Sequence, residues 1–512
     1  MNIILKLAPK TAGMAMEISQ GTTVDEIVQM VGEQLPYRVY AGRINNKVVP
    51  LTAQVPAGAE VVLLDMRDPD GKEAYQNSVL RLYMAAVKAE RPEADILISS
   101  SLNRGIFTFI NNAGEITQEF ADTVEKRMRA WSKSPVDFTE IYDGPDLVVP
   151  ATGYVRNFDL KLCRSGIVVR IPEDTHPEGL APYRDDVKLY DAFAVENQWG
   201  EKLGICNFTD LNRTIEAGGI KDVILVSEAL HEKNVAEIAS RIIESGKRIV
   251  LIAGPSSSGK TSFAKRLCTQ LWVCGSKPVY LGTDDYYLDR DKIPVGPDGK
   301  QNFENLDSID VELFNRQMND LLAGKEVDIP RFDFQSGKQV FGERIEKLGP
   351  DQPVVIEGIH GLNDAMTPSI SADDKFKIYI SPLTQIRIDE HHRVPLTDVR
   401  KLRRIIRDAA KRGWSAKQTI NAWPDVRAGE DVNIFPYSSS ADVLFNSTQV
   451  YELAVIKKYA RPLLEAIPED DEDYCEAQRL LRLLSHVTEI EDDRVVASNS
   501  ILREFIGGST IV

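Results

Sequence analysis

The sequence has few of the residues that build disulfide frameworks and metal clusters. Its 512 residues include only six histidines, and no two of its five cysteines form a CxxC pair. An odd number of cysteines without paired spacing fits neither a disulfide scaffold nor a zinc ribbon, and it indicates a reducing compartment. The cysteines are Cys163, Cys206, Cys268, Cys274 and Cys475.

Long apolar runs are also missing. No stretch approaches the roughly 20 apolar residues that cross a bilayer, and the opening MNIILKLAPK has neither the length nor the basic flank of a signal peptide. We therefore expect a cytoplasmic protein without a membrane partner. Positive charge is scarce as well, because the formal net charge is −16. This argues against tight sequence-independent binding to nucleic acid, which needs clustered Lys and Arg.

Length and changes of pattern divide the chain into five parts, since 512 residues exceed one ordinary core. Residues 1–66 are expected to form a small mixed α/β unit, with a helix in TTVDEIVQMVGEQL that Thr23 and Glu26 begin as a capping box. The polar stretch RDPDGKEAYQ marks the boundary to a second unit at 67–200, with helices in SVLRLYMAAVKAE and EFADTVEKRMRAW. A linker and helix (201–245), an α/β domain (246–468) and a tail of unassigned function (469–512) follow.

The α/β domain alternates apolar strands with helical stretches. The strands are RIVLIA, KPVYLG, PVVIEG and KFKIYI. Continuous apolar strands that alternate with helices predict a parallel sheet covered on both faces.

A phosphate-binding loop follows the first of these strands. GPSSSGKT, residues 254–261, matches G-x-x-x-x-G-K-[ST] in full and opens a helix with apolar residues at Phe263, Leu267 and Leu271. Glycines at both ends let backbone N–H groups turn toward phosphate oxygens, and the helix adds its positive N-terminal end. Lys260 is expected to reach the β- and γ-phosphates of ATP, and the Thr261 hydroxyl to bind Mg²⁺.

Carboxylates follow two further strands, at the sheet edge where ligands bind in open α/β folds. GTDDYY places Asp284 and Asp285 there, and PVVIEG places Glu357. A single acid at a strand end is more often a helix cap or a solvated charge. Beside a phosphate-binding loop, however, a kinase needs a base for the attacking hydroxyl and a carboxylate near the metal.

The stretch VRKLRRIIRDAAKRG predicts an amphipathic helix with arginines on one face. Such a helix can close over bound nucleotide, place guanidinium groups on the transferred phosphate and exclude water. A solvated basic face and a nucleic-acid contact are the alternatives. The arginines are Arg400, Arg403, Arg404, Arg407 and Arg412.

Several motifs in order resemble the uridine kinase and phosphoribulokinase family of P-loop kinases. They lie between about residues 248 and 468 and are GPSSSGKT, TDDYY, NFENLDSID, IPRFDF, VVIEGIHGL, RRIIRDAAKRG and SSSADVLFN. The resemblance implies a kinase that uses ATP and Mg²⁺, and it suggests a homo-oligomer.

The resemblance also implies roles for single residues. Asp284 corresponds to the base that accepts the proton of a ribose 5′-hydroxyl, and Glu357 to the metal-associated carboxylate. The expected catalytic residues are Lys260, Asp284, Arg404 and Arg407, and the metal ligands are Thr261 and Glu357. The expected ATP-binding residues are Gly254, Pro255, Ser256, Ser257, Ser258, Gly259, Lys260, Thr261, Ser262 and Arg412; the substrate-binding residues are Asp284, Tyr287, Glu304, Phe332 and Arg403.

This sequence departs from the family pattern on the acceptor side. Glu304 replaces the ribose-binding Asp of the FDHP motif, and Phe332 replaces the Tyr of the YDF motif. Gly337 and Gln339 stand where uridine kinases have His and Arg, and an extra segment, RIDEHHRVPLTD, precedes the arginine helix. The phosphoryl-transfer residues are retained, whereas the residues that select a pyrimidine are altered.

The N-terminal part resembles the front of threonyl-tRNA synthetase. Residues 1–66 are similar to a TGS domain of β-grasp fold, and residues 67–200 to the α+β editing domain, on YQNSVLRLYMAAV and DGPDLVVPATGYVRNFDL. The zinc-ligand positions of that editing domain correspond to Tyr75, Val79, Tyr142 and Asp146. Since catalytic zinc needs about three protein ligands, deacylation is not expected. RNA contact, small-molecule sensing, assembly and a purely structural role remain open.

Three hypotheses follow. The first is an ATP-dependent kinase of a nucleoside, uridine or cytidine, that phosphorylates the 5′-hydroxyl. The second keeps the chemistry but changes the acceptor to another small hydroxyl compound such as a sugar phosphate. The third is an RNA-binding regulatory protein in which nucleotide acts as a switch.

Overall fold

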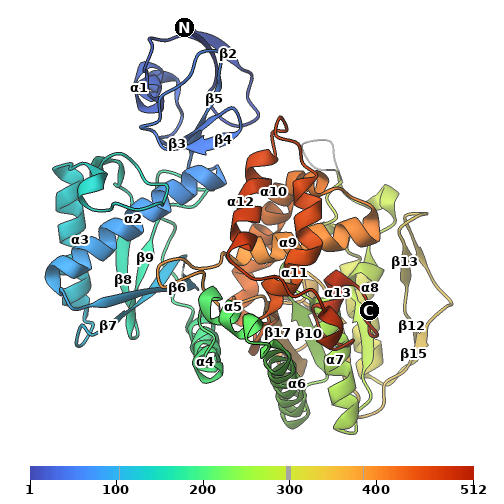
Figure 1. Ribbon diagram of the computed structural model, residues 1–512. Coiled ribbons are helices and arrows are strands. Elements are labelled where there is room, and N and C mark those ends of the chain that lie inside the picture. The colour runs from blue at the N-terminus through green and yellow to red at the C-terminus, as the bar shows by residue number, and fades with distance from the viewer. Residues whose placement is uncertain (103, 296–300, 385) are drawn as a thin grey trace. The chain divides into compact units, whose positions relative to one another are not determined.

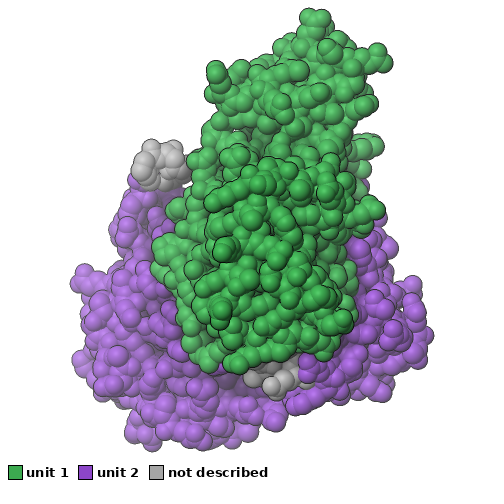
Figure 2. All heavy atoms as spheres, turned by 90° about the vertical axis from the view of Figure 1, so that its left-hand side faces the viewer, with its two compact units in different colours: residues 1–187, 387–393, 467–479 green, residues 188–386, 394–466, 480–512 purple. Residues whose placement is uncertain are grey.

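A computed structural model describes residues 1–102, 104–295, 301–384 and 386–512 (Figure 1). The chain forms two compact units, coloured separately in Figure 2. Unit 1 consists of Met1–Val187, Arg387–Arg393 and Ile467–Arg479, and unit 2 of Lys188–Ile386, Val394–Ala466 and Leu480–Val512. Residues 201–245, expected to be a linker and a helix, thus belong to the same unit as the phosphate-binding loop. Residues 188–200, expected in the second unit, belong to it as well.

Unit 1 begins with a mixed five-stranded sheet in the order β2-β1-β5-β3-β4. Strands β1 and β5 are parallel, and the other pairs are antiparallel. Helix α1 (Val24–Met30) packs its Val24 and Ile27 into this core, and the predicted capping box of Thr23 and Glu26 is confirmed. The strands are β1 (Asn2–Lys6), β2 (Met14–Glu17), β3 (Val39–Ile44), β4 (Lys47–Val49) and β5 (Glu60–Asp65).

The second sheet of unit 1 is antiparallel, in the order β6-β7-β9-β8. Its strands are β6 (Asp95–Leu102), β7 (Gly105–Asn111), β8 (Asp159–Cys163) and β9 (Gly166–Arg170), and helices α2 (Pro69–Glu90) and α3 (Gln118–Lys133) share its core. The polar stretch RDPDGKEAYQ, predicted to mark the boundary to a second unit, lies between these two sheets in the chain. Most of it forms the first turns of α2, because Asp68 caps the helix and Pro69 suits its first position.

Unit 2 contains the predicted parallel sheet. Its order is β11-β16-β10-β17-β18, and every neighbouring pair is parallel. Four of the strands match the predicted apolar runs, and β18 lies in the SSSADVLFN motif. The strands are β10 (Ile249–Ala253), β11 (Val279–Gly282), β16 (Val354–Glu357), β17 (Lys375–Ser381) and β18 (Val443–Asn446).

The central strand β10 is buried on both faces, which explains why it reads as a continuous apolar run. Val250 and Ile252 pack with helices α6 (Ile220–Ser245) and α7 (Lys260–Val273). Ile249 and Leu251 pack on the opposite face with α8 (Val311–Leu322). Successive side chains of a strand point to opposite faces, so this alternation produces the helix–sheet–helix layers.

The remaining helices complete the two units. They are α4 (Val187–Leu203), α5 (Phe208–Glu216), α9 (Leu396–Arg412), α10 (Ala416–Asn433), α11 (Glu452–Glu465), α12 (Tyr474–Ser485) and α13 (Arg503–Ile506). Two short antiparallel pairs, β12 (Val327–Asp328) with β15 (Ile345–Glu346) and β13 (Arg331–Asp333) with β14 (Lys338–Val340), lie between α8 and β16 in the chain. Among the described residues, no helix is long and apolar enough to span a membrane.

Candidate active site

The phosphate-binding loop joins β10 to α7 at the carboxyl edge of the sheet (Figure 1). Gly254 has no room for a side chain, since a Cβ there would lie 2.0 Å from the carbonyl oxygen of Ile380. Lys260 Nζ donates to the carbonyl oxygens of Gly254, at 2.9 Å, and Pro255, at 3.4 Å. Lys260 therefore folds back onto the backbone of its own loop.

Two hydroxyls of the loop are buried without a hydrogen-bond partner among the described residues. In the described part of the chain, Ser257 Oγ and Ser258 Oγ find no hydrogen-bond partner, although both residues are at least 96% buried. A buried polar group without a partner costs free energy. A phosphate group in the loop would supply acceptors, so these hydroxyls fit the expected nucleotide.

The predicted metal ligands lie next to each other. Thr261 Oγ1 donates to Glu357 Oε1 at 3.0 Å, and Tyr280 Oη donates to the same oxygen at 3.2 Å. Sheet register explains the meeting, because Glu357 pairs with Ile252 of β10 on one side and with Gly282 of β11 on the other. A hydroxyl and a carboxylate are oxygen ligands of the kind Mg²⁺ takes beside nucleotide phosphates.

Asp284 follows β11 and lies near Glu357 and Lys260. Asp284 as a whole residue is exposed, although many protein atoms lie near its carboxylate. Burial and the nearby charge of Glu357 raise the pKa of Asp284 to about 6, against the opposing effect of Lys260. A carboxylate with a raised pKa beside a phosphate site is suited to accept a proton from an attacking hydroxyl.

This raised pKa predicts the pH dependence of turnover. Below about pH 6 Asp284 is increasingly protonated and cannot accept a proton, whereas above it the base is available. We expect kcat/KM to fall about tenfold per pH unit below about pH 6 and to level off above about pH 7. Initial rates between about pH 5 and pH 8 measure this, with circular dichroism as the check that the fold persists. A flat profile across that range would contradict the assignment.

Helix α9 holds the loop from one side through its arginines. Arg400 Nε donates to the Ser256 carbonyl at 2.9 Å, Arg404 Nη1 to Ser256 Oγ at 2.8 Å, and Arg403 Nη1 to the Ser257 carbonyl at 3.2 Å. Arg400 and Arg403 are 3% and 0% exposed. The alternative of a solvated basic face therefore does not hold for these two residues.

The five arginines differ in what they can offer a ligand. Arg403 is bonded to both carboxylate oxygens of Glu452, at 2.5 and 2.6 Å, so its predicted contact with substrate finds no support in this geometry. Arg404, Arg407 and Arg412 all pair with the buried Asp408. Of these, Arg404 reaches the phosphate-binding loop, and Arg412 is half exposed.

Aromatic rings lie near Asp284, in the region expected to bind the phosphate acceptor, which is called the acceptor side below. Tyr287 contacts Phe303, Phe332 and Phe334 with ring centroids 5.5, 5.6 and 6.3 Å apart. Phe332 is buried, whereas Phe334 is 58% exposed. Glu304 is exposed, and its charge acts on both Asp284 and Tyr287. The predicted substrate residues Asp284, Tyr287, Glu304 and Phe332 are thus brought together.

Several residues of this region were missed from the sequence. Glu430 Oε1 accepts from the Ser256 N–H at 2.8 Å and also pairs with Arg400. His360 is fully buried near the backbone of Glu304, and burial lowers its pKa to about 4, so the ring is neutral. The histidine in EGIHGL was the one available signal for His360, whereas nothing local marks Glu430.

The four positions of unit 1 that correspond to the zinc ligands of the editing domain do not form a metal site in the described residues. Among the described residues, no group of three or more His, Cys, Asp or Glu could hold a metal ion. Asp146 is bonded to Arg81 at 2.5 Å and to His392 Nε2 at 3.0 Å. Although burial opposes it, these bonds hold the pKa of Asp146 well below its usual range. Tyr75 and Val79 are fully buried, and Tyr142 stacks on Arg81.

His392 comes from the extra segment that precedes α9, and residues 387–393 of that segment belong to unit 1. The Ile98 N–H donates to the carbonyl oxygen of Glu390 at 3.0 Å, which extends the edge of β6. Asp389 Oδ2 lies 2.7 Å from His392 Nδ1 and orients the ring. The insertion therefore has a defined place in the fold.

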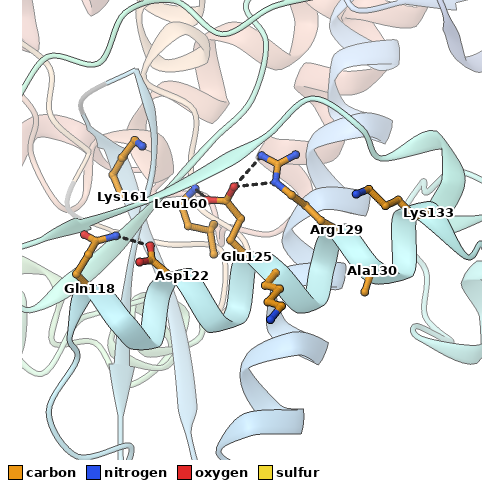
Figure 3. Close-up of a pocket in the computed structure, with 9 residues that line it drawn as sticks. Gln118, Asp122, Glu125, Arg129, Ala130, Lys133, Leu160 and Lys161 are labelled. Carbon is orange, nitrogen blue, oxygen red and sulfur yellow. Dashed lines mark hydrogen bonds and ion pairs between the residues drawn. The ribbon is translucent and has the colours of Figure 1, made fainter.

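A separate hollow of about 620 Å³ lies beside α3 and β8 in unit 1. Figure 3 shows Glu125 bonded to Arg129 and to the backbone N–H of Leu160, and Gln118 bonded to Asp122. These side chains satisfy one another, so the hollow offers no group comparable to the loop and carboxylates of unit 2.

Comparison with known proteins agrees with this geometry. The model of the phosphoribulokinase / uridine kinase family matches residues 249–454. The uridine kinase of Ligilactobacillus salivarius (strain UCC118) is 30% identical over 175 residues, which cover 34% of this chain and 73% of the relative. The chain belongs to the phosphoribulokinase / uridine kinase family. It is an ATP-dependent kinase.

A further relative and a solved structure are similar to part of this chain. The uridine kinase of Chloroflexus aurantiacus (strain ATCC 29366 / DSM 635 / J-10-fl) is 28% identical over 199 residues, 38% of this chain and 85% of the relative. A solved structure described as a possible uridine kinase from Bacillus stearothermophilus is 19% identical, with a TM-score of 0.29, over 42% of this chain and 98% of that one.

Proposed function

We propose that this kinase transfers the γ-phosphoryl group of ATP to the 5′-hydroxyl of a nucleoside, uridine or cytidine. The observation that carries the proposal is the convergence of Lys260, Glu357 and Asp284 at the ends of three neighbouring elements. The uridine kinase relatives support the choice of acceptor.

Each residue has a part in the proposed reaction. The loop N–H groups and Lys260 bind the β- and γ-phosphates, and Thr261 and Glu357 hold Mg²⁺, which neutralises developing charge on the phosphates. Asp284 takes the proton of the attacking hydroxyl. In the proposed reaction Arg404 and Arg407 stabilise the transferred group, and Tyr287 and Phe332 contact the acceptor.

The character of the acceptor side favours a neutral compound over a sugar phosphate. Asp284 and Glu304 bring negative charge to it, and Tyr287, Phe332 and Phe334 bring aromatic surface. Like charges repel a phosphorylated acceptor, whereas flat rings pack against aromatic faces. The changes at Gly337 and Gln339 leave the identity of the base to experiment.

ADP release with ATP, Mg²⁺ and a panel of nucleosides, sugars and sugar phosphates tests the proposal. Turnover on uridine or cytidine supports it, and turnover on a sugar phosphate alone refutes the acceptor but keeps the kinase chemistry. ATP binding without turnover on any acceptor would refute the nucleoside kinase function. Filter binding with tRNA then tests an RNA-binding role of the N-terminal module.

For the N-terminal module, the proposed relationship is to the TGS and editing regions of threonyl-tRNA synthetase. The sheet order β2-β1-β5-β3-β4 with α1 supports a β-grasp unit at residues 1–66. Contact with RNA, homo-oligomer formation and a cytoplasmic location stay predictions.

A further inference from the structure

The segment 500–506 lies outside the residues that match the family, yet it packs into the core of the kinase unit. It includes the short helix α13, and Ser500, Ile501 and Phe505 are at most 1% exposed. Ile501 and Phe505 belong to the same buried cluster as Phe263 and Leu267 of α7. The segment is therefore part of the support of the helix that follows the phosphate-binding loop.

Glu504 is bonded to the first turn of that helix. Its Oε2 accepts from the Ser262 N–H at 3.2 Å and from Ser262 Oγ at 2.6 Å. Ser262 is fully buried, and Glu504 is 8% exposed. Two bonds from one residue to one carboxylate oxygen fix the direction of this turn, and a carboxylate near a helix N-terminus is electrostatically favourable.

The same segment touches the loop itself. A Cβ at Gly259, whose φ is +85°, would lie 2.4 Å from Ile501 Cγ2, so the backbone there is packed directly against Ile501. The Phe505 ring lies 4.9 Å from the guanidinium of Arg403, which donates to the Ser257 carbonyl. Segment 500–506 thus contacts the loop directly at Gly259, contacts the first turn of α7 at Ser262, and lies against Arg403, which is bonded to Ser257.

The segment is itself anchored. Ser500 Oγ donates to Glu228 Oε1 at 2.6 Å, and Tyr451 Oη donates to the same oxygen at 2.5 Å. Ser500 Oγ also accepts from the Leu502 N–H at 3.2 Å. Glu504 therefore projects toward Ser262 from a fixed base rather than from a loose end of the chain.

We propose that segment 500–506 is part of the scaffold of the ATP site and that Glu504 is a positioning residue for the phosphate-binding loop. This rests on the proposed role of residues 254–261 in binding ATP phosphates. A phosphate site works by holding its donors in place before the ligand arrives. By fixing Ser262, Glu504 sets where the neighbouring N–H groups of Lys260 and Thr261 point.

The test compares three variants of the full chain by calorimetric titration with Mg²⁺ and ATP and by steady-state kinetics. For Glu504→Ala we expect Kd and KM for ATP to rise about tenfold or more, because a buried charge-assisted interaction is lost. Glu504→Gln keeps an oxygen that accepts both Ser262 bonds, so it should stay within about threefold of the wild type. Glu491→Ala changes an exposed glutamate that precedes segment 500–506, and it should not alter Kd or KM for ATP.

The KM for the acceptor distinguishes a positioning role of Glu504 from a general loosening of the fold. A positioning role raises KM for ATP and leaves KM for the acceptor unchanged, whereas a loosened fold raises both. If Glu504→Ala binds ATP as tightly as the wild type does, the inference is overturned. The proposed function still stands in that case, because the wild type binds ATP. Absence of ATP binding by the wild type would overturn both.

A second variant covers the case in which Glu504→Ala does not fold. Ser262→Ala removes the 2.6 Å bond to Glu504 without altering segment 500–506. Alanine suits a helix interior, so α7 persists. We expect a several-fold weaker ATP affinity with an unchanged acceptor KM, and wild-type affinity in this variant would contradict the role of Glu504.

Discussion

Replacement of Asp284 by asparagine is expected to lower kcat by about 10²–10⁴-fold, the contribution typical of a general base. Asparagine preserves the shape of the side chain but cannot accept the hydroxyl proton. The affinity for ATP should change little, because in the proposed site the loop and Lys260, and not Asp284, hold the phosphates. Steady-state ADP release and a direct titration with ATP measure the two quantities.

The neighbouring acid provides a matched control. Asp285 follows the same strand, but its carboxylate interacts with the backbone of Phe332 and with Arg344 rather than with Lys260. Asp285→Asn removes the same charge one residue away and should retain at least about a third of the wild-type kcat, because it removes no proton acceptor. Equal losses in both variants would mean that charge or folding, and not proton transfer, explains the effect.

The motif of the proposed phosphate site can be recognised from the sequence because its signal is local. The loop, its strand and its helix occupy a continuous stretch, and the strand-end acids Asp284 and Glu357 follow from the rule that parallel strands present one edge to the ligand. Sheet register then brings Glu357 beside Thr261, as expected. The same locality explains the capping box at Thr23, which the structure confirms.

What the sequence could not show depends on contacts between distant residues. Glu430 meets Ser256 across 174 positions, and Glu504 meets Ser262 across 242. Neither glutamate stands in a motif, so no periodicity or spacing marks it. The predicted contact of Arg403 with substrate depends on the helical pattern of arginines in α9, which does not show which of them are buried. Its burial against Glu452 becomes visible only when α9 and α11 are packed together.

The start of α2 shows how local polarity misleads. RDPDGKEAYQ is rich in residues typical of loops, yet Asp68 and Pro69 are a cap and a first-turn residue. Ala74 and Tyr75, within the same stretch, are fully buried in the core of the second sheet. Tertiary burial thus outweighed the turn propensity of Asp, Gly and Lys.

Replacement of Lys260 by alanine is the second change with a large expected effect. Within the described part of the chain Lys260 has no carboxylate partner, and its ammonium group is held only by the carbonyl oxygens of Gly254 and Pro255. Its charge is therefore available for the β- and γ-phosphates. Loss of a preorganised cation at the transferred group is expected to lower kcat by about 10²–10³-fold.

The Lys260→Ala variant should differ from Asp284→Asn in its affinity for ATP. In the proposed mechanism Lys260 contacts the nucleotide before and during transfer, so its loss should also weaken ATP binding about tenfold or more. Loss of Asp284 should leave ATP binding unchanged. Lys277→Ala, which removes an exposed lysine stacked on Trp272, is the control and should match the wild type. Normal ATP affinity in Lys260→Ala, with an unchanged melting temperature, would place the phosphates elsewhere than in the 254–261 loop.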